Sequence, residues 1–126
     1  MTNREIRRWY VAQVRIIPEQ SEAWTREGIP AEVRARRAFE IRRRARREAR
    51  DMMLDPKDVE TLQRRDQANY GNPDGPTFEQ LVEALGKTFS GDALYEELIA
   101  QAARTDAETN KRFGLSRQTP ESKREL

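Results

Sequence analysis

The predicted fold is organised around residues 31–53, AEVRARRAFEIRRRARREARDMM. When successive residues are placed about 100° apart, as in an α-helix, the alanines of this stretch, Phe39 and the two methionines gather on one face. Nine arginines share the stretch with this apolar stripe. The pattern predicts a long arginine-rich helix over residues 30–53, with its apolar face packed into the core.

The arginines of this helix are predicted to lie in two environments. Arg42 projects into the middle of the apolar face, and Arg46 lies beside it. Because an unpaired buried guanidinium costs several kcal/mol, both must find acceptors. The acceptors are either acidic residues of the chain itself or a phosphate or carboxylate of a ligand held in a pocket. A separate ridge, predicted to be a solvated face or a footprint for nucleic-acid phosphates, consists of Arg36, Arg43, Arg47 and Arg50.

The composition excludes several kinds of site. The chain has 126 residues, which predicts one domain, and 37% charged against 36% hydrophobic residues, which favours amphipathic helices over a thick sheet core. It has no cysteine and no histidine, so we predict no disulfide, no thiol nucleophile and none of the usual zinc sites. We also expect no other metal and no cofactor. No run approaches the roughly 20 apolar residues that span a bilayer, and no hydrophobic signal segment follows Met1.

The net charge of +2 conceals an asymmetry between the two halves of the chain. Residues 1–50 hold 14 Lys/Arg and 7 Asp/Glu, a net charge of +7, whereas residues 51–126 hold 10 and 15, a net charge of −5. Opposite charges on the two halves favour internal ion pairs that hold them together. The alternative is that the basic half faces a polyanion.

Helices are predicted on both sides of the central one. Thr2 with Glu5, Thr77 with Gln80, and Thr105 with Glu108 each have the spacing of a capping box, and Asp55-Pro56 is a further start signal. No stretch alternates in polarity as a half-buried strand does. The sequence therefore predicts an all-α domain of six to seven helices over residues 1–115. Residues 116–126, SRQTPESKREL, are predicted to form a flexible polar tail.

The loop YGNPDGP, residues 70–76, holds two glycines and two prolines and predicts consecutive tight turns. It is either a plain connection between helices or a rigid support for Tyr70, Asn72 and Asp74. Without histidine or cysteine, an acid or base must be a carboxylate or a tyrosine, which makes Tyr70, Asp74 and Glu79 the catalytic candidates. Asn72 joins Arg42, Arg43, Arg46 and Arg50 as a candidate ligand for an anion. A calcium loop starting at residue 70 would place Leu81 where a bidentate Glu belongs, so calcium is rejected.

Four segments carry a family resemblance. REIRRWY (4–10), RAxxAFEIRRRARREARDMM (34–53), DQANYGNPDGPTFEQLVE (66–83) and RTDAETNKRFGL (104–115) resemble a domain at the C-terminal ends of bacterial polymorphic toxins, of the Rhs type and among type VI secretion effectors. The resemblance implies a toxin module with a cognate immunity protein and a secretion-system carrier. It also implies a histidine at the position of Arg43. This departure leaves open whether the chain is active.

Three functions follow as hypotheses. The first is an antibacterial effector toxin domain that acts in the target-cell cytoplasm on a phosphate-bearing target, nucleic acid or nucleotide. The second is a non-enzymatic interaction module, such as an adaptor, an immunity protein or a carrier-docking protein. The third is a nonspecific nucleic-acid binder that uses the basic helix face. The expected location is the bacterial cytoplasm, or a target cell reached through a specialised secretion system.

Overall fold

The computed structural model describes residues 2–53 and 55–112, which form six helices and no strand. The helices are α1 (Asn3–Val14), α2 (Ile17–Arg26), α3 (Ala31–Met52), α4 (Pro56–Tyr70), α5 (Phe78–Leu85) and α6 (Gly91–Arg112). The all-α prediction is confirmed. The expected domain end at residue 115 and the expected tail over 116–126 lie outside the described residues.

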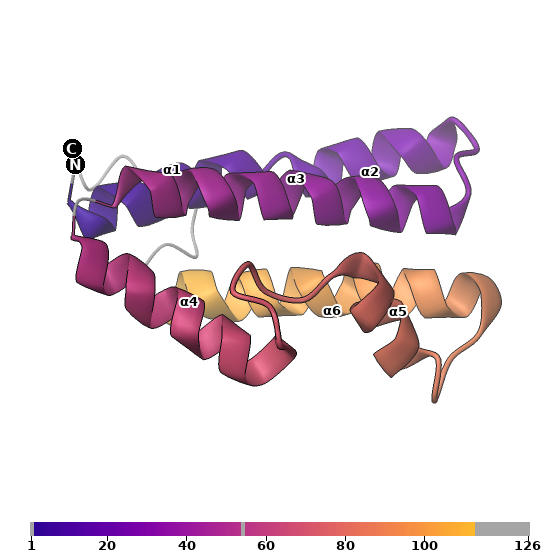
Figure 1. The fold of residues 1–126 in the computed structure, drawn as a ribbon. Coiled ribbons are helices and arrows are strands. Elements are labelled where there is room, and N and C mark those ends of the chain that lie inside the picture. The colour runs from indigo at the N-terminus through magenta and orange to yellow at the C-terminus, as the bar shows by residue number, and fades with distance from the viewer. Residues whose placement is uncertain (1, 54, 113–126) are drawn as a thin grey trace.

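Helix α3 is the centre of the arrangement, as predicted. Helices α1 and α2 follow one another along α3 in the upper layer of Figure 1, and α4, α5 and α6 form the layer below. The packing between helices is most extensive for α1 against α3, and then for α6 against α3. α3 therefore belongs to both halves of the fold.

Most of the helix starts follow the local signals in the sequence. Thr2 and Thr77 each form a reciprocal capping box, with Glu5 and Gln80 respectively. The Asp55 carboxylate accepts a hydrogen bond from the Lys57 backbone N–H at 2.9 Å and caps α4. These side chains satisfy backbone donors that the first turn of a helix leaves without a partner.

The predicted start of a last short helix at Thr105 is wrong, because α6 runs without a break from Gly91 to Arg112. Neither glycine nor proline interrupts residues 92–112, so nothing forces the helix to end. Asp106, in the middle of the supposed cap, instead pairs with Arg42 of α3. Packing against α3 thus outweighs a capping signal worth about 1 kcal/mol.

The core consists of two clusters, and α3 contributes alanines to each. Val14 and Ile17 pack on Ala38 and Ala45 in the upper cluster. The lower cluster joins Ala35 of α3 to Phe78, Leu98 and the partly buried side chains around them. Small side chains on both faces of α3 allow the neighbouring helices to approach its backbone closely.

Ion pairs connect the basic half to the acidic half, as the charge asymmetry predicts. Arg34 pairs with Glu96 at 2.6 Å, and Arg36 lies 3.8 Å from Glu79. Further arginines of α3 pair with aspartates of α4, α6 and the 71–76 loop. Among the described residues, no helix has both the length and the apolar character needed to cross a membrane.

Candidate functional site

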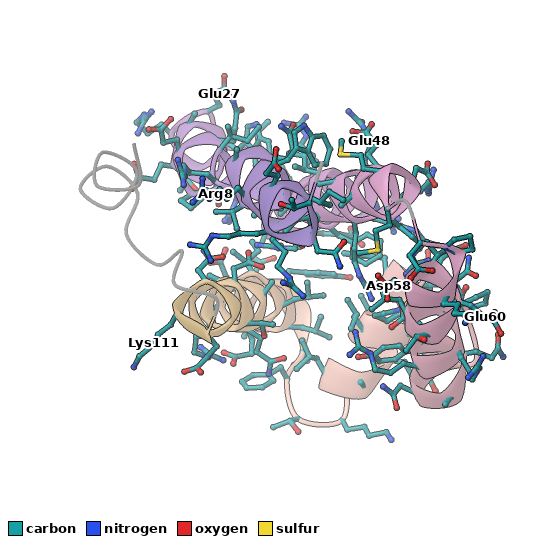
Figure 2. All side chains as sticks on the ribbon, turned by 90° about the vertical axis from the view of Figure 1, so that its left-hand side faces the viewer. Arg8, Glu27, Glu48, Asp58, Glu60 and Lys111 are labelled. Carbon is teal, nitrogen blue, oxygen red and sulfur yellow. The ribbon has the colours of Figure 1, made fainter. Side chains whose placement is uncertain are left out.

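A cleft of about 710 Å³ lies between the two layers of helices. Its walls hold twelve apolar side chains, two tyrosines, two aspartates, three other polar side chains and six arginines. The arginines are Arg7, Arg42, Arg43, Arg46, Arg50 and Arg65. Figure 2 views the layers end on, and its labelled Glu48, Glu60 and Lys111 point outward, away from the space between α3 and α6. The cleft therefore combines an apolar lining with an excess of positive charge.

Arg42 of α3 and Asp106 of α6 form an ion pair in the wall of the cleft. Arg42 donates to the Asp106 carboxylate from Nε at 2.9 Å and from Nη2 at 2.7 Å, and both side chains are mostly buried. Tyr10 of α1 lies beside this pair. Its pKa is raised mainly by burial and also by the Asp106 carboxylate, while Arg42 and Arg46 act in the opposite direction. The acidic half thus supplies the acceptor that the core-facing Arg42 requires.

Arg46 and Arg50 share one buried acceptor, Asp66 of α4. Asp66 Oδ2 accepts from Arg46 Nη2 at 2.7 Å and from Arg50 Nη2 at 3.0 Å, and the Asp66 side chain is only 5% exposed. Arg50 also donates from Nη1 to the Pro73 carbonyl at 3.0 Å and to Asp74 Oδ1 at 3.2 Å. These bonds tie the C-terminal end of α3 to α4 and to the loop after it.

The prediction that Arg50 belongs to a solvated ridge is wrong, because Arg50 is the most buried of the α3 arginines, at 8% exposed. Arg42, Arg46 and Arg50 are spaced four residues apart, so they form one stripe along the helix. Helix α4 and the loop after it cover the end of that stripe. Within the described residues, the Arg50 Nε atom is buried and has no hydrogen-bond partner.

The loop over residues 71–76 packs closely against the guanidinium groups of Arg46 and Arg50. Gly75 is buried with φ +91°, and a Cβ atom there would lie 2.4 Å from Arg46 Nη1. Only glycine allows both this backbone conformation and this close approach. The Asn72 side chain accepts a hydrogen bond from the Asp74 backbone N–H at 3.0 Å, so Asn72 stabilises the turn.

Two arginines of the cleft have no carboxylate partner within the described part of the chain. Arg43 is half-buried with its guanidinium 5.8 Å from the centre of the Phe39 ring, and Arg65 is exposed on α4. Arg43 was predicted to lie on the solvated ridge, whereas it lines the cleft. Of the remaining ridge residues, Arg47 is exposed as predicted, and Arg36 is exposed beside the Phe78 ring.

The three catalytic candidates do not meet at one place. Asp74 and Tyr70 both line the cleft. Glu79 does not line it, and its side chain is 75% exposed next to Arg36. The geometry therefore groups Asp74 and Tyr70 with the arginines and leaves Glu79 apart. Residues 2–53 and 55–112 contain no group of three or more side chains arranged to hold a metal ion.

Asp66, which accepts hydrogen bonds from Arg46 and Arg50, is the site residue that was not predicted from the sequence. It follows Val59 and Leu62 at helical spacing, so it lies on the apolar face of α4. A carboxylate on such a face needs a charged partner. That requirement could have linked Asp66 to the inward arginines of α3.

Comparison of the chain with protein-family models, curated proteins and solved structures finds no match. The resemblance to polymorphic toxin domains remains a prediction, since none of these comparisons tests it.

Proposed function

We propose that this chain is an effector toxin domain that binds a phosphate-bearing target, nucleic acid or nucleotide, in the arginine-lined cleft and acts in the cytoplasm of a target bacterium. The excess of arginine in the cleft is the observation that carries the proposal. Six arginines line the cleft. Three of them pair with aspartates, and two others, Arg43 and Arg65, make no ion pair to a described residue. Positive charge inside a partly apolar cleft attracts an anion more strongly than the same charge on an open surface.

Asp74 is the group that the geometry offers as a base if the bound target is also converted. Its side chain is 54% exposed at the cleft wall, and Arg50 donates to one oxygen only, Oδ1. The carboxylate can therefore accept a proton through Oδ2. Tyr70 lines the same cleft.

Growth of a bacterium that expresses the chain in its cytosol tests the proposal. Wild-type protein should arrest growth, and Arg43→Ala should relieve the arrest because it removes a cleft arginine without breaking an ion pair to a described residue. Arg47→Ala is the matched control, since Arg47 lies one turn further along α3, is exposed and does not line the cleft. Normal growth of all three strains would exclude the toxin function, and equal arrest of all three would exclude the role of Arg43. Co-expression of a cognate immunity protein should restore growth in the wild-type strain.

A second groove favours the alternative of a protein-interaction module. It lies on the outer side of α2 and α3, and its lining includes Trp24, Val33, Ile41 and Arg44. Val33 is 37% exposed there, so apolar surface is open beside arginine. The lining holds three arginines and two glutamates, so an immunity or carrier protein with an apolar helix flanked by charges of both signs would suit such a groove. Co-purification from the native host should return one stoichiometric partner, and loss of that partner with Val33→Glu would support this function over the first.

A further inference from the structure

We infer that the cleft takes a free nucleotide or a phosphate ester of similar size, with the phosphate on Arg43 and Arg46, and that it does not take a nucleic-acid polymer. This inference rests on the proposed function and narrows its target class. It follows from three properties of the cleft. Its two walls differ in charge, Arg43 and Arg46 have N–H groups that can donate to a phosphate, and one end of the cleft is lined by apolar side chains.

The two walls of the cleft differ in charge. The α3 wall carries Arg42, Arg43, Arg46 and Arg50. On the opposite wall the charged side chains are Arg65, Asp74 and Asp106, a net charge of −1. A polymer needs a continuous positive path for its phosphates as they enter and leave a site. A wall with a single arginine does not offer such a path, whereas a small ligand can place its few negative charges against α3 alone.

Arg43 and Arg46 each have guanidinium N–H groups that can donate hydrogen bonds to a phosphate. Arg43 makes no ion pair to any described residue, and the Arg46 side chain is 41% exposed with only Nη2 bonded to Asp66. The two residues are three apart and face the same side of α3. Asp66 and the backbone of Gly75 hold the Arg46 guanidinium in place, so little side-chain freedom is lost when it binds. Two guanidinium forks fixed on one face suit the oxygens of a phosphate.

The end of the cleft beyond these arginines is apolar. Phe39, Leu81, Leu85 and Leu98 line it, and Phe39 lies edge-on to Phe78 with the ring centres 5.5 Å apart. Phe39 is seven positions from Arg46, about 10 Å along the helix axis, and four positions from Arg43, whose guanidinium lies 5.8 Å from the ring centre. The volume of about 710 Å³ falls within the range of small-molecule sites. A molecule with a phosphate at one end and a flat, largely apolar ring at the other matches this layout.

Equilibrium titration of the full chain tests the inference in two arms. One arm uses ribonucleoside mono- and triphosphates, with nucleosides and inorganic pyrophosphate as reference ligands. The other uses a single-stranded RNA and a DNA duplex at physiological salt. Nucleotides should bind at least about tenfold more tightly than nucleosides, pyrophosphate or either polymer. Arg43→Ala should weaken nucleotide binding about tenfold, and Arg47→Ala should change it by less than about twofold.

Arg46→Lys is the second variant. It keeps the positive charge next to Asp66 and loses only the planar guanidinium with its paired N–H donors. It should fold as the wild type does and still bind nucleotides about tenfold less tightly. Polymer binding that depends on Arg43, without nucleotide binding, would overturn the inference and leave the proposed function standing. Pyrophosphate binding as tight as that of nucleotides would also overturn it, since the ring would then contribute nothing. No binding in either arm would remove the proposed function as well.

Discussion

Asp66→Asn is the substitution that most directly tests the account of the buried arginines. Asparagine has nearly the same shape as aspartate, so the change removes charge and leaves the packing in place. Asp66 is 5% exposed and accepts from both Arg46 and Arg50. Breaking a buried ion pair by removing one partner costs about 3–5 kcal/mol. Because Arg50 keeps two other acceptors at Pro73 and Asp74, we expect the lower end of this range, about 3 kcal/mol.

Urea denaturation followed by circular dichroism measures this loss in the free energy of unfolding, and thermal unfolding should show Tm lower by about 12 °C. Asp51→Asn is the matched control, because Asp51 is an exposed aspartate of α3 with no ion pair to a described residue. Its stability should equal that of the wild type within error. A loss below about 1 kcal/mol for Asp66→Asn, or one equal to the control, would refute the view that Asp66 holds α4 against α3.

Four further substitutions test other parts of the structure. Gly75→Ala should lower the free energy of unfolding by about 1–3 kcal/mol in urea denaturation, because φ is positive there and the new Cβ would meet the Arg46 guanidinium; an unchanged value would contradict this loop geometry. Tyr10→Phe should reduce the loss of Tm as the pH rises through about 10, since the raised pKa of Tyr10 favours its neutral form in the folded state, and that stabilisation is present below pH 10 and lost above it. Thr77→Ala should cost about 1 kcal/mol through loss of a helix cap, whereas Thr105→Ala should cost much less, because residue 105 lies inside α6; equal losses in the same assay would indicate that α6 is broken there.

Most of the helices could be predicted from the sequence, because the residues that start a helix act locally. Side chains such as Thr2, Asp55 and Thr77 act within a few residues of the backbone groups that they cap, so their effect can be predicted without knowing the fold. The separate helix expected at Thr105 failed for the opposite reason. There, a contact with Arg42, 64 residues away in the sequence, decides the conformation.

The candidate site was predictable only in part. Helical spacing identified Arg42 and Arg46 as inward-facing, and the charge asymmetry indicated that the C-terminal half would supply partners. Periodicity alone does not tell which side of α3 will be covered at its C-terminal end, and for that reason Arg50 was misplaced. The pairing with Asp66 depends on how α4 folds back, which no local pattern specifies.

The position of α3 between the two core clusters also has a consequence for synthesis on the ribosome. Residues 1–50, with a net charge of +7, leave the ribosome before Asp66, Asp74 and Asp106, which pair with their arginines. Translation proceeds at about 5–20 residues per second, so several seconds pass between the synthesis of residues 1–50 and the synthesis of the last of these aspartates. During this interval α1, α2 and α3 can already associate, since their contacts are local in sequence, but the α3 arginines remain open to the polyanions around them. Residues 1–50 therefore carry more uncompensated positive charge during synthesis than after the rest of the domain has folded against them.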